Sequence, residues 1–352
     1  MFFISVICAI LHILFVLSES AAEFYTLNVA PFFRLPLSFI SSVFPFSIGE
    51  SFILITLVIV AFFVLSLIIT LLFKRKTNWR VYLKILAAFL LFVIVTFVLT
   101  FDSSYRRMGI DESIGLEKVE MNAENVSAAL DKIIVEVSLL EEIIPHSPAK
   151  PTSYSTTFFD LAKKVNEAAD VAAEKYPYLQ KHGFPAKPVA ASTPLAYTGI
   201  SGIYTFFTGE SNINTVFAPY SIPFTMAHEY SHQRGVGPES EAEFSALLIC
   251  LESDDPYVRY SAYSQAAITL SNLLFEYDTD LFYDALSQFP KILFYDIVSS
   301  SKSYKEYSKT VLDEIASTIN DKYLKANSDK GIISYSLSAE LYCAYFLQEV
   351  YK

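Results

Sequence analysis

The feature that most constrains this chain is an almost wholly apolar run at residues 52–73, which carries no charge. About 20 such residues cross a bilayer as a helix, so this run predicts a membrane-spanning helix. A second run, at residues 81–100, is interrupted only by Lys84 near one end, where a long side chain can reach the interface. The shorter run 2–17 predicts a first spanning helix or a signal-like segment, and a weak cleavage site favours a retained helix.

The distribution of basic residues predicts how these helices are oriented. Lys74, Arg75, Lys76 and Arg80 lie between the second and third apolar runs, whereas residues 19–50 hold a single basic residue. The positive-inside rule therefore places this connection and the N-terminus in the cytoplasm. Everything after residue 101 is then extracytoplasmic. The opposing charges are fewer, namely Arg34, Arg106 and Arg107.

Composition agrees with a membrane protein and excludes one class of partner. Hydrophobic residues make up 53% of the chain, and the mean hydropathy is +0.38. The net charge is -11, and the basic residues form no stripe that nucleic acid would need. We therefore expect a lipid bilayer as a partner and no nucleic acid.

The rest of the chain predicts a mainly helical fold with a small β component. Residues 1–101 form the transmembrane region, and residues 102–157 form a helical connector followed by a loop rich in Pro, Ser and Thr. Residues 158–352 form the remaining domain. Within it, residues 199–207 have strand-like composition, and the section from residue 223 onward reads as mostly helical.

One motif carries chemistry, the HExxH sequence formed by His228, Glu229 and His232. Residues four apart on a helix share a face, so both imidazoles can bind one zinc ion. Glu229 is displaced by one position and reaches a water on the metal, where it can act as the general base. The motif predicts a zinc-dependent hydrolase, although HExxH also occurs by chance on exposed helices.

The residues after the motif predict the third ligand. Gly235 can end the helix in a left-handed turn, and an acidic stretch begins a few residues later. We assign Glu239 as the ligand, Glu243 as a residue that orients a histidine, and Glu241 as the reserve ligand. The alternative is an acidic first turn that only suits the helix dipole.

Other side chains are less specific. Tyr260, Tyr263 and Arg259 are predicted donors to the developing oxyanion, and Tyr335 is a weaker one. The strand at 199–207 either borders the cleft and pairs with an extended substrate, or is an ordinary core strand. Among the cysteines, Cys250 and Cys343 pair if the domain faces an oxidising side, but two buried thiols are favoured. Cys8 lies in the first apolar run.

At this point the sequence resembles the bacterial membrane proteins grouped as domain of unknown function 3810. The resemblance rests on HExxH and on segments 199–204, 207–212, 232–235, 239–244, 259–263, 321–325 and 331–335. It implies N-terminal transmembrane helices followed by a zincin-like domain of gluzincin type, in which Glu239 is the third ligand. The chain departs from the family at Glu243, where the family usually has Asn, and at Phe206, where it tends to have Pro.

The resulting prediction is a membrane-anchored zinc metallopeptidase in the bacterial cell membrane, acting on a peptide or protein substrate. The alternative is a catalytically inactive zinc-binding membrane protein that acts in binding or envelope assembly. The presence of Glu229 favours the enzyme, because a pure binding site needs the histidines but not the base. Intramembrane proteolysis is disfavoured, since Arg234, Glu239 and Glu241 crowd the motif.

Overall fold

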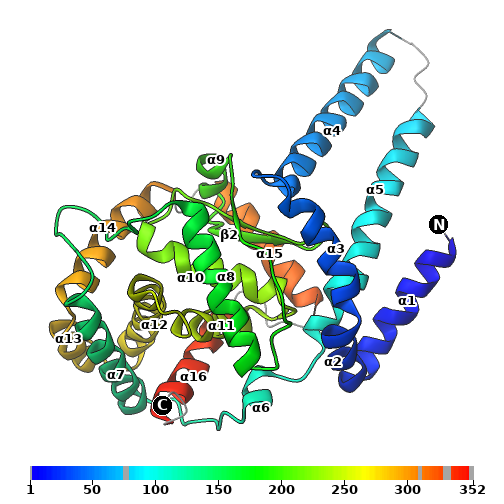
Figure 1. The fold of residues 1–352 in the computed structure, drawn as a ribbon. Helices are drawn as coiled ribbons and strands as arrows, with labels where there is room; N and C mark the ends of the chain where they lie inside the picture. The colour runs from blue at the N-terminus through cyan, green and yellow to red at the C-terminus, as the bar shows by residue number, and fades with distance from the viewer. Residues whose placement is uncertain (1, 74–78, 308–310, 328–333, 349–352) are drawn as a thin grey trace.

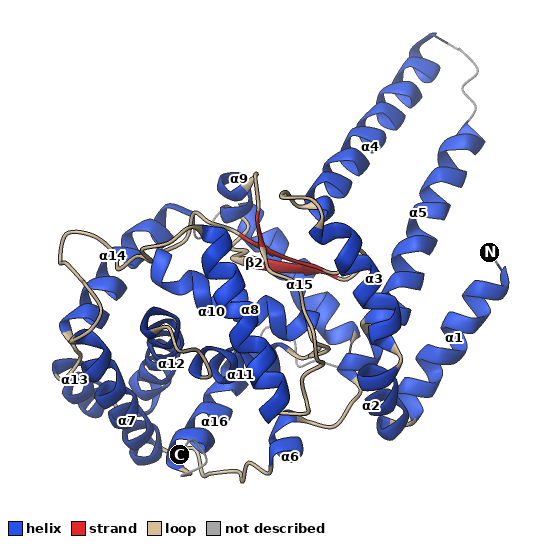
Figure 2. Cartoon of the chain, viewed as in Figure 1, coloured by secondary structure: helices blue, strands red, loops and turns tan. Residues whose placement is uncertain are grey.

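The structure, a computed structural model, describes residues 2–73, 79–307, 311–327 and 334–348. The predicted cytoplasmic charges Lys74, Arg75 and Lys76, and the segment 331–333 of the family resemblance, lie outside the described residues. The chain is mostly helical and has one small sheet, as Figure 2 shows.

The N-terminal part consists of five helices. They are α1 (Phe2–Leu17), α2 (Glu19–Asn28), α3 (Ala30–Ser42), α4 (Ile48–Phe73) and α5 (Trp79–Thr100). Helices α4 and α5 project from the body as a pair (Figure 1). Both are long and apolar enough, by length and composition, to cross a membrane, so two of the three predicted spans are helices of the required kind. Helix α1 is shorter, at about 24 Å for its 16 residues.

Helices α2 and α3 were not predicted. Helix α3 has the reverse of the usual amphipathic pattern. Its buried face carries polar side chains: Arg34 donates to Gln180 Oε1 (2.9 Å) and to the His182 carbonyl (2.9 Å). Ser38 donates to the Gly209 carbonyl (2.9 Å). Its outer face is apolar and exposed, at Phe32, Phe33, Phe39 and Ile40. Arg34, counted among the charges that oppose the predicted orientation, is therefore a buried residue that joins α3 to the body.

The body is built from short and medium helices around a common apolar core. After η1 (Asp102–Tyr105) they are α6 (Ile110–Ile114), α7 (Ala123–Glu141), α8 (Phe158–Lys175), α9 (Ser192–Ala196), η2 (Pro219–Ser221), α10 (Ile222–Gln233), α11 (Glu239–Leu251), α12 (Pro256–Tyr277), α13 (Thr279–Ser287), α14 (Lys291–Tyr307), α15 (Val311–Ala326) and α16 (Ser334–Leu347). Helix α7 packs on α12, and its apolar face belongs to the same core as α10 and α11. The predicted connector at residues 102–157 is thus part of the body.

Three strands form the sheet: β1 (Lys187–Pro188), β2 (Gly202–Thr205) and β3 (Glu210–Ile213). Their order is β1-β3-β2, with β1 parallel and β2 antiparallel to the central β3. Strand β2 is therefore an edge strand, and it lies against α10. An edge position is required by the first of the two alternatives predicted for residues 199–207, in which the strand pairs with an extended substrate.

A buried ion pair within the sheet lies at the start of α4. Glu210 of β3 accepts from Lys187 Nζ at 2.6 Å, and the two side chains are 2% and 7% exposed. The Glu210 carboxylate also accepts from the backbone amides of Ile48 (3.0 Å) and Gly49 (2.7 Å). These amides begin α4, where an anion is favoured by the unpaired N–H groups. Glu210 therefore serves the start of α4.

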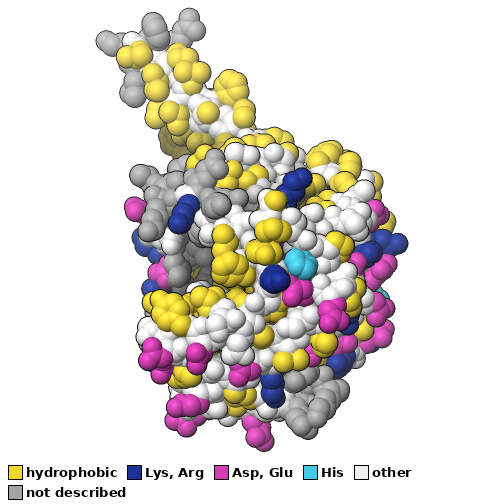
Figure 3. Space-filling view, turned by 90° about the vertical axis from the view of Figure 1, so that its left-hand side faces the viewer, with side chains coloured by type: hydrophobic (Ala, Val, Ile, Leu, Met, Phe, Trp, Pro, Cys, Tyr) yellow, Lys and Arg dark blue, Asp and Glu magenta, His cyan; other side chains and the backbone are white. Residues whose placement is uncertain are grey.

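The surface separates into two regions. Figure 3 shows hydrophobic side chains over the projecting helices, whereas acidic side chains are spread over the body. All three cysteines are buried and unpaired, so the structure favours buried thiols over a Cys250–Cys343 disulfide.

Candidate metal centre

Helix α10 holds the two histidines one turn apart. Their ring centroids are 4.8 Å apart, and the two Nε2 atoms are separated by 3.2 Å. The helix ends at Gly235, whose φ of 84° is the left-handed conformation that glycine adopts without strain. The Val236 amide donates back to the Ser231 carbonyl (3.0 Å), which closes the turn. Pro238 then lies at the N-cap of α11.

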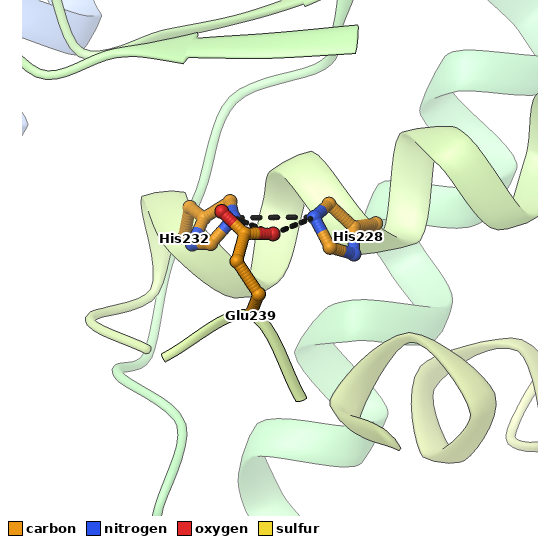
Figure 4. Close-up of side chains that lie close together, drawn as sticks. All are labelled: His228, His232 and Glu239. Carbon is orange, nitrogen blue, oxygen red and sulfur yellow. Dashed lines mark hydrogen bonds and ion pairs between the residues drawn. The ribbon is translucent and has the colours of Figure 1, made fainter. Parts of the chain in front are cut away.

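The first residue of α11 completes the cluster, as Figure 4 shows. Glu239 Oε2 lies 3.2 Å from His228 Nε2 and 3.7 Å from His232 Nε2. These three residues form a group whose ligand atoms all lie within 4.8 Å of one another. Glu241, the reserve ligand, instead accepts a hydrogen bond from the buried hydroxyl of Tyr178.

On each imidazole the other ring nitrogen, Nδ1, faces an oxygen atom. His232 Nδ1 lies 2.8 Å from the Val236 carbonyl oxygen, and a carbonyl can only accept. His228 Nδ1 lies 3.2 Å from Glu243 Oε2, and Gln265 donates to the other Glu243 oxygen (3.1 Å). Both imidazoles are thereby favoured with the proton on Nδ1, leaving a lone pair on each Nε2.

The donor set fits a zinc ion. At bonds of about 2.0–2.1 Å, neighbouring ligands of a tetrahedral zinc are about 3.3–3.4 Å apart. The separations of 3.2, 3.2 and 3.7 Å among the His228, His232 and Glu239 atoms are close to this value. Two lone pairs and a carboxylate that meet in a buried space repel one another unless a cation lies between them. The chemistry of the site therefore favours a cation.

The pKa shifts of His228 and Glu239 also favour a cation at this site. Burial lowers the pKa of His228, but Glu239 and Glu243 outweigh it and hold this pKa well above its usual value. Burial raises the pKa of Glu239, but the two imidazoles hold it well below its usual value. The site thus attracts positive charge and keeps Glu239 ionised, as a metal ligand must be.

Glu229 lies beside the cluster under the edge strand. It is only 4% exposed, and burial raises its pKa, although His228 and His232 act in the opposite direction. The backbone of Tyr204 in β2 also acts to lower this pKa. A Cβ atom at Gly202 would come within 2.5 Å of Glu229 Oε1, so β2 passes close only because this residue is glycine.

A cleft of about 650 Å³ opens over these residues. It is lined by residues 198–204, which include most of β2, and by residues of α15. The backbone N–H of Asn214 donates to the Ser201 carbonyl (2.8 Å). In an antiparallel pair, hydrogen-bonded residues alternate with residues whose backbone groups point away from the partner strand, so those of Gly202 and Tyr204 point away from β3. The free edge of β2 therefore faces the cleft.

The predicted oxyanion donors lie elsewhere. Tyr260 is fully buried and donates to Asp296 Oδ2 (2.6 Å), and Tyr263 packs against the Phe346 ring. Neither they nor Arg259 line the cleft. They face away because α12 turns this side of the helix into the core. The side chain of Tyr335 lies outside the described residues.

The structure instead brings Tyr323 of α15 into the cleft, where Tyr105 donates to its hydroxyl (3.3 Å). Tyr323 is 38% exposed, yet the protein crowded around its hydroxyl raises its pKa to about 12, and the charge of Glu239 adds to this effect. The hydroxyl therefore stays protonated and can donate. Sequence reasoning missed it, although Tyr323 lies in segment 321–325 of the family resemblance.

These features define a mostly helical protein with two helices long and apolar enough to span a bilayer and a partly buried His–His–Glu cluster. The chain belongs to the family described as Protein of unknown function (DUF3810), whose model matches residues 25–342. The match begins within α2 and ends within α16, so it includes α4 and α5 as well as the body. No curated protein and no solved structure matches the chain.

Proposed function

We propose that this protein is a membrane-anchored, zinc-dependent peptidase with a zincin-like body. The observation that carries the proposal is the convergence of His228 Nε2, His232 Nε2 and Glu239 Oε2, with the Glu229 carboxylate beside them. A bound zinc ion polarises a carbonyl group and makes water acidic near neutral pH. This combination suits hydrolysis of an amide bond.

The chain's own residues supply the remaining steps. Glu229, with its raised pKa, takes a proton from the attacking water and passes it to the departing amine. Water thus adds across the peptide bond, giving a carboxylic acid and an amine. Tyr323 and Tyr105 replace Tyr260 and Tyr263 as our candidates for hydrogen bonding to the developing oxyanion. The free edge of β2 binds the substrate's main chain as an added strand.

The test separates this enzyme from a catalytically inactive zinc-binding protein. The purified full-length protein and its Glu229→Gln variant are each assayed for zinc content by mass spectrometry and for cleavage of a peptide library. We expect about one zinc per chain in both, and cleavage slowed by about 10²–10⁴-fold in the variant. Zinc in both proteins with cleavage in neither supports the inactive protein, and undiminished cleavage by the variant contradicts the role of Glu229.

We further propose that the body lies outside the cytoplasm of a bacterial cell membrane. The support is the basic sequence between the apolar runs 52–73 and 81–100, which includes Arg80, together with the positive-inside rule. A cysteine placed at the exposed Asp284 of α13 tests this, because the native cysteines are buried. We expect it to react with a membrane-impermeant thiol reagent in intact cells. Reaction only after permeabilisation contradicts the topology.

A further inference from the structure

The metal centre lies at the end of a candidate membrane span. Helix α5 ends at Thr100, and the ring of the next residue, Phe101, lies 5.9 Å from the ring of His232. The Phe101 ring also packs 5.4 Å from the ring of Tyr204, which is in the edge strand β2. One side chain thus contacts a proposed zinc ligand, the proposed substrate strand and the end of α5.

The turn between β2 and β3 rests on the same helices. Thr100 donates to the Phe206 carbonyl (3.4 Å), and the Phe207 ring lies 5.5 Å from the ring of Phe52 in α4. On the other side, Ser38 of α3 donates to the Gly209 carbonyl. A polypeptide paired with the free edge of β2 therefore has one end directed at α3, α4 and α5.

The exposed apolar side chains show where lipid covers these helices. Phe39, Ile40 and Val43 are 60%, 62% and 69% exposed, and they continue the apolar surface of α4 and α5. A continuous apolar surface of this kind marks a contact with membrane or protein, and here it adjoins two candidate spans. A lipid bilayer is the occupant that suits both parts.

The burial of side chains along α5 indicates where the bilayer ends relative to the body. Thr96, Val98 and Thr100 are buried in the protein, whereas most of the preceding helix is exposed. Lipid contact therefore ends near residue 95, about six residues or roughly 9 Å before Phe101, whose ring contacts that of His232. The cleft lies just outside the membrane surface.

We infer that the substrates are membrane-anchored polypeptides, cleaved in an extended segment within a few residues of the bilayer. This inference rests on the proposed peptidase function and adds the substrate class. The cleft wall beside α5 is aromatic, from Phe101, Tyr105, Tyr204 and Phe206. Such a wall suits the aromatic and aliphatic residues that are common where a transmembrane helix leaves the membrane.

The test uses the full-length protein, loaded with zinc and reconstituted in lipid vesicles. The probe is a polyleucine helix of about 20 residues, joined by a spacer to a randomised cassette of aromatic, aliphatic and polar residues. Spacers of roughly 3 and 30 residues differ by up to about 90 Å of reach. A soluble peptide with the same cassette is the third probe, and mass spectrometry of the new N-termini reports cleavage.

We expect the short-spacer probe to be cleaved about tenfold faster than the long-spacer probe, since both are tethered and only reach differs. Equal rates for the two spacers, or equal cleavage of the soluble cassette, overturn the inference and leave the peptidase intact. Absence of Glu229-dependent cleavage from all three probes overturns the proposed function and the inference with it.

A second readout does not depend on activity. A fluorophore on Ile203→Cys, in the cleft, is compared with one on Asp284→Cys in α13, which lies far from α4 and α5 (Figure 1). Lipids that carry a spin label on the headgroup quench by proximity. We expect quenching at least about twofold stronger at position 203, since the cleft lies roughly 9 Å from the lipid boundary. Equal quenching contradicts the placement of the cleft at the membrane surface.

Discussion

Glu243 Oε2 lies 3.2 Å from His228 Nδ1, on the side of the imidazole opposite the nitrogen that faces Glu239. The carboxylate is itself held by Gln265. This arrangement fixes the orientation of the ring and makes its Nε2 a better metal ligand.

Replacing this carboxylate is expected to weaken metal binding. Glu243→Gln removes the charge that stabilises the Nδ1–H tautomer, so we expect zinc affinity to fall by about 10–100-fold. Competition with a chromogenic chelator measures the change. Glu241→Gln is the matched control, because Glu241 lies on the same helix but contacts Tyr178. Equal affinities in the two variants would show that Glu243 does not orient His228.

The third ligand is tested by Glu239→Gln. A neutral amide cannot supply the charge that Glu239 places 3.2 and 3.7 Å from the two imidazoles. We expect the variant to lose its zinc during a dialysis in which the parent keeps its zinc, because the proposed third ligand is removed. Metal analysis after dialysis measures this. Retention of one zinc per chain would exclude Glu239 as a ligand.

Gly202 is expected to control the position of the proposed base. Alanine at this position would place Cβ 2.5 Å from Glu229 Oε1, so the carboxylate must move. We expect Gly202→Ala to keep its zinc while its rate of peptide cleavage falls by about 10²-fold, the effect of a misplaced group of this kind. Ser201→Ala is the control in the same segment. A Gly202→Ala variant as active as the control would refute the proposed contact.

The ion pair between Lys187 and Glu210 is expected to matter for stability. Lys187→Met leaves a buried carboxylate without its cation, which costs about 3–5 kcal/mol of unfolding free energy. Lys163→Met is the control, because its pair with Glu167 is exposed and contributes at most about 0.5 kcal/mol. Unfolding in mixed micelles measures both. A difference under about 1 kcal/mol would contradict the importance of the buried pair.

Asp296 predicts a defined pH dependence. Burial raises its pKa above the usual value, even though Tyr260 and Thr152 donate to its carboxylate. The folded state therefore binds the proton more tightly than the unfolded state. Between the unfolded pKa and the raised folded pKa, the free energy of unfolding falls as pH rises, and below this window the contribution is complete.

Thermal unfolding of the parent and of Asp296→Asn from about pH 3.5 to pH 7 isolates this group. We expect the parent to lose stability relative to the variant as the pH rises. Parallel curves for the two proteins would show that Asp296 titrates alike in the folded and unfolded states.

The sequence predicts the cluster better than it predicts its surroundings. His228, His232 and Glu239 were identified because helix spacing and a glycine turn are local properties. Residues 52–73 and 81–100 were predicted as helices from length and apolar composition alone. Tyr260 and Tyr323 could not be ranked, because which of many tyrosines reaches the cleft depends on how α12 and α15 pack.

Helix α3 was missed for a different reason. Periodicity rules assume that apolar residues face inward and polar residues face water. In α3 the polar residues Arg34 and Ser38 face the protein, and phenylalanines face outward. The polar and apolar residues of α3 alternate regularly, but this pattern predicts an inward face only when it is known whether water or lipid surrounds the helix.

The inward contacts of α3 also limit how the molecule can be divided. A fragment that begins at residue 102 would lack Arg34, leaving the Gln180 side chain and the His182 carbonyl without the donor that each now accepts from. It would also uncover the Gly209 carbonyl beside the sheet. Truncation at this point therefore removes part of the scaffold that supports the candidate metal centre, and detergent or nanodisc samples of the intact chain are the appropriate material for testing it.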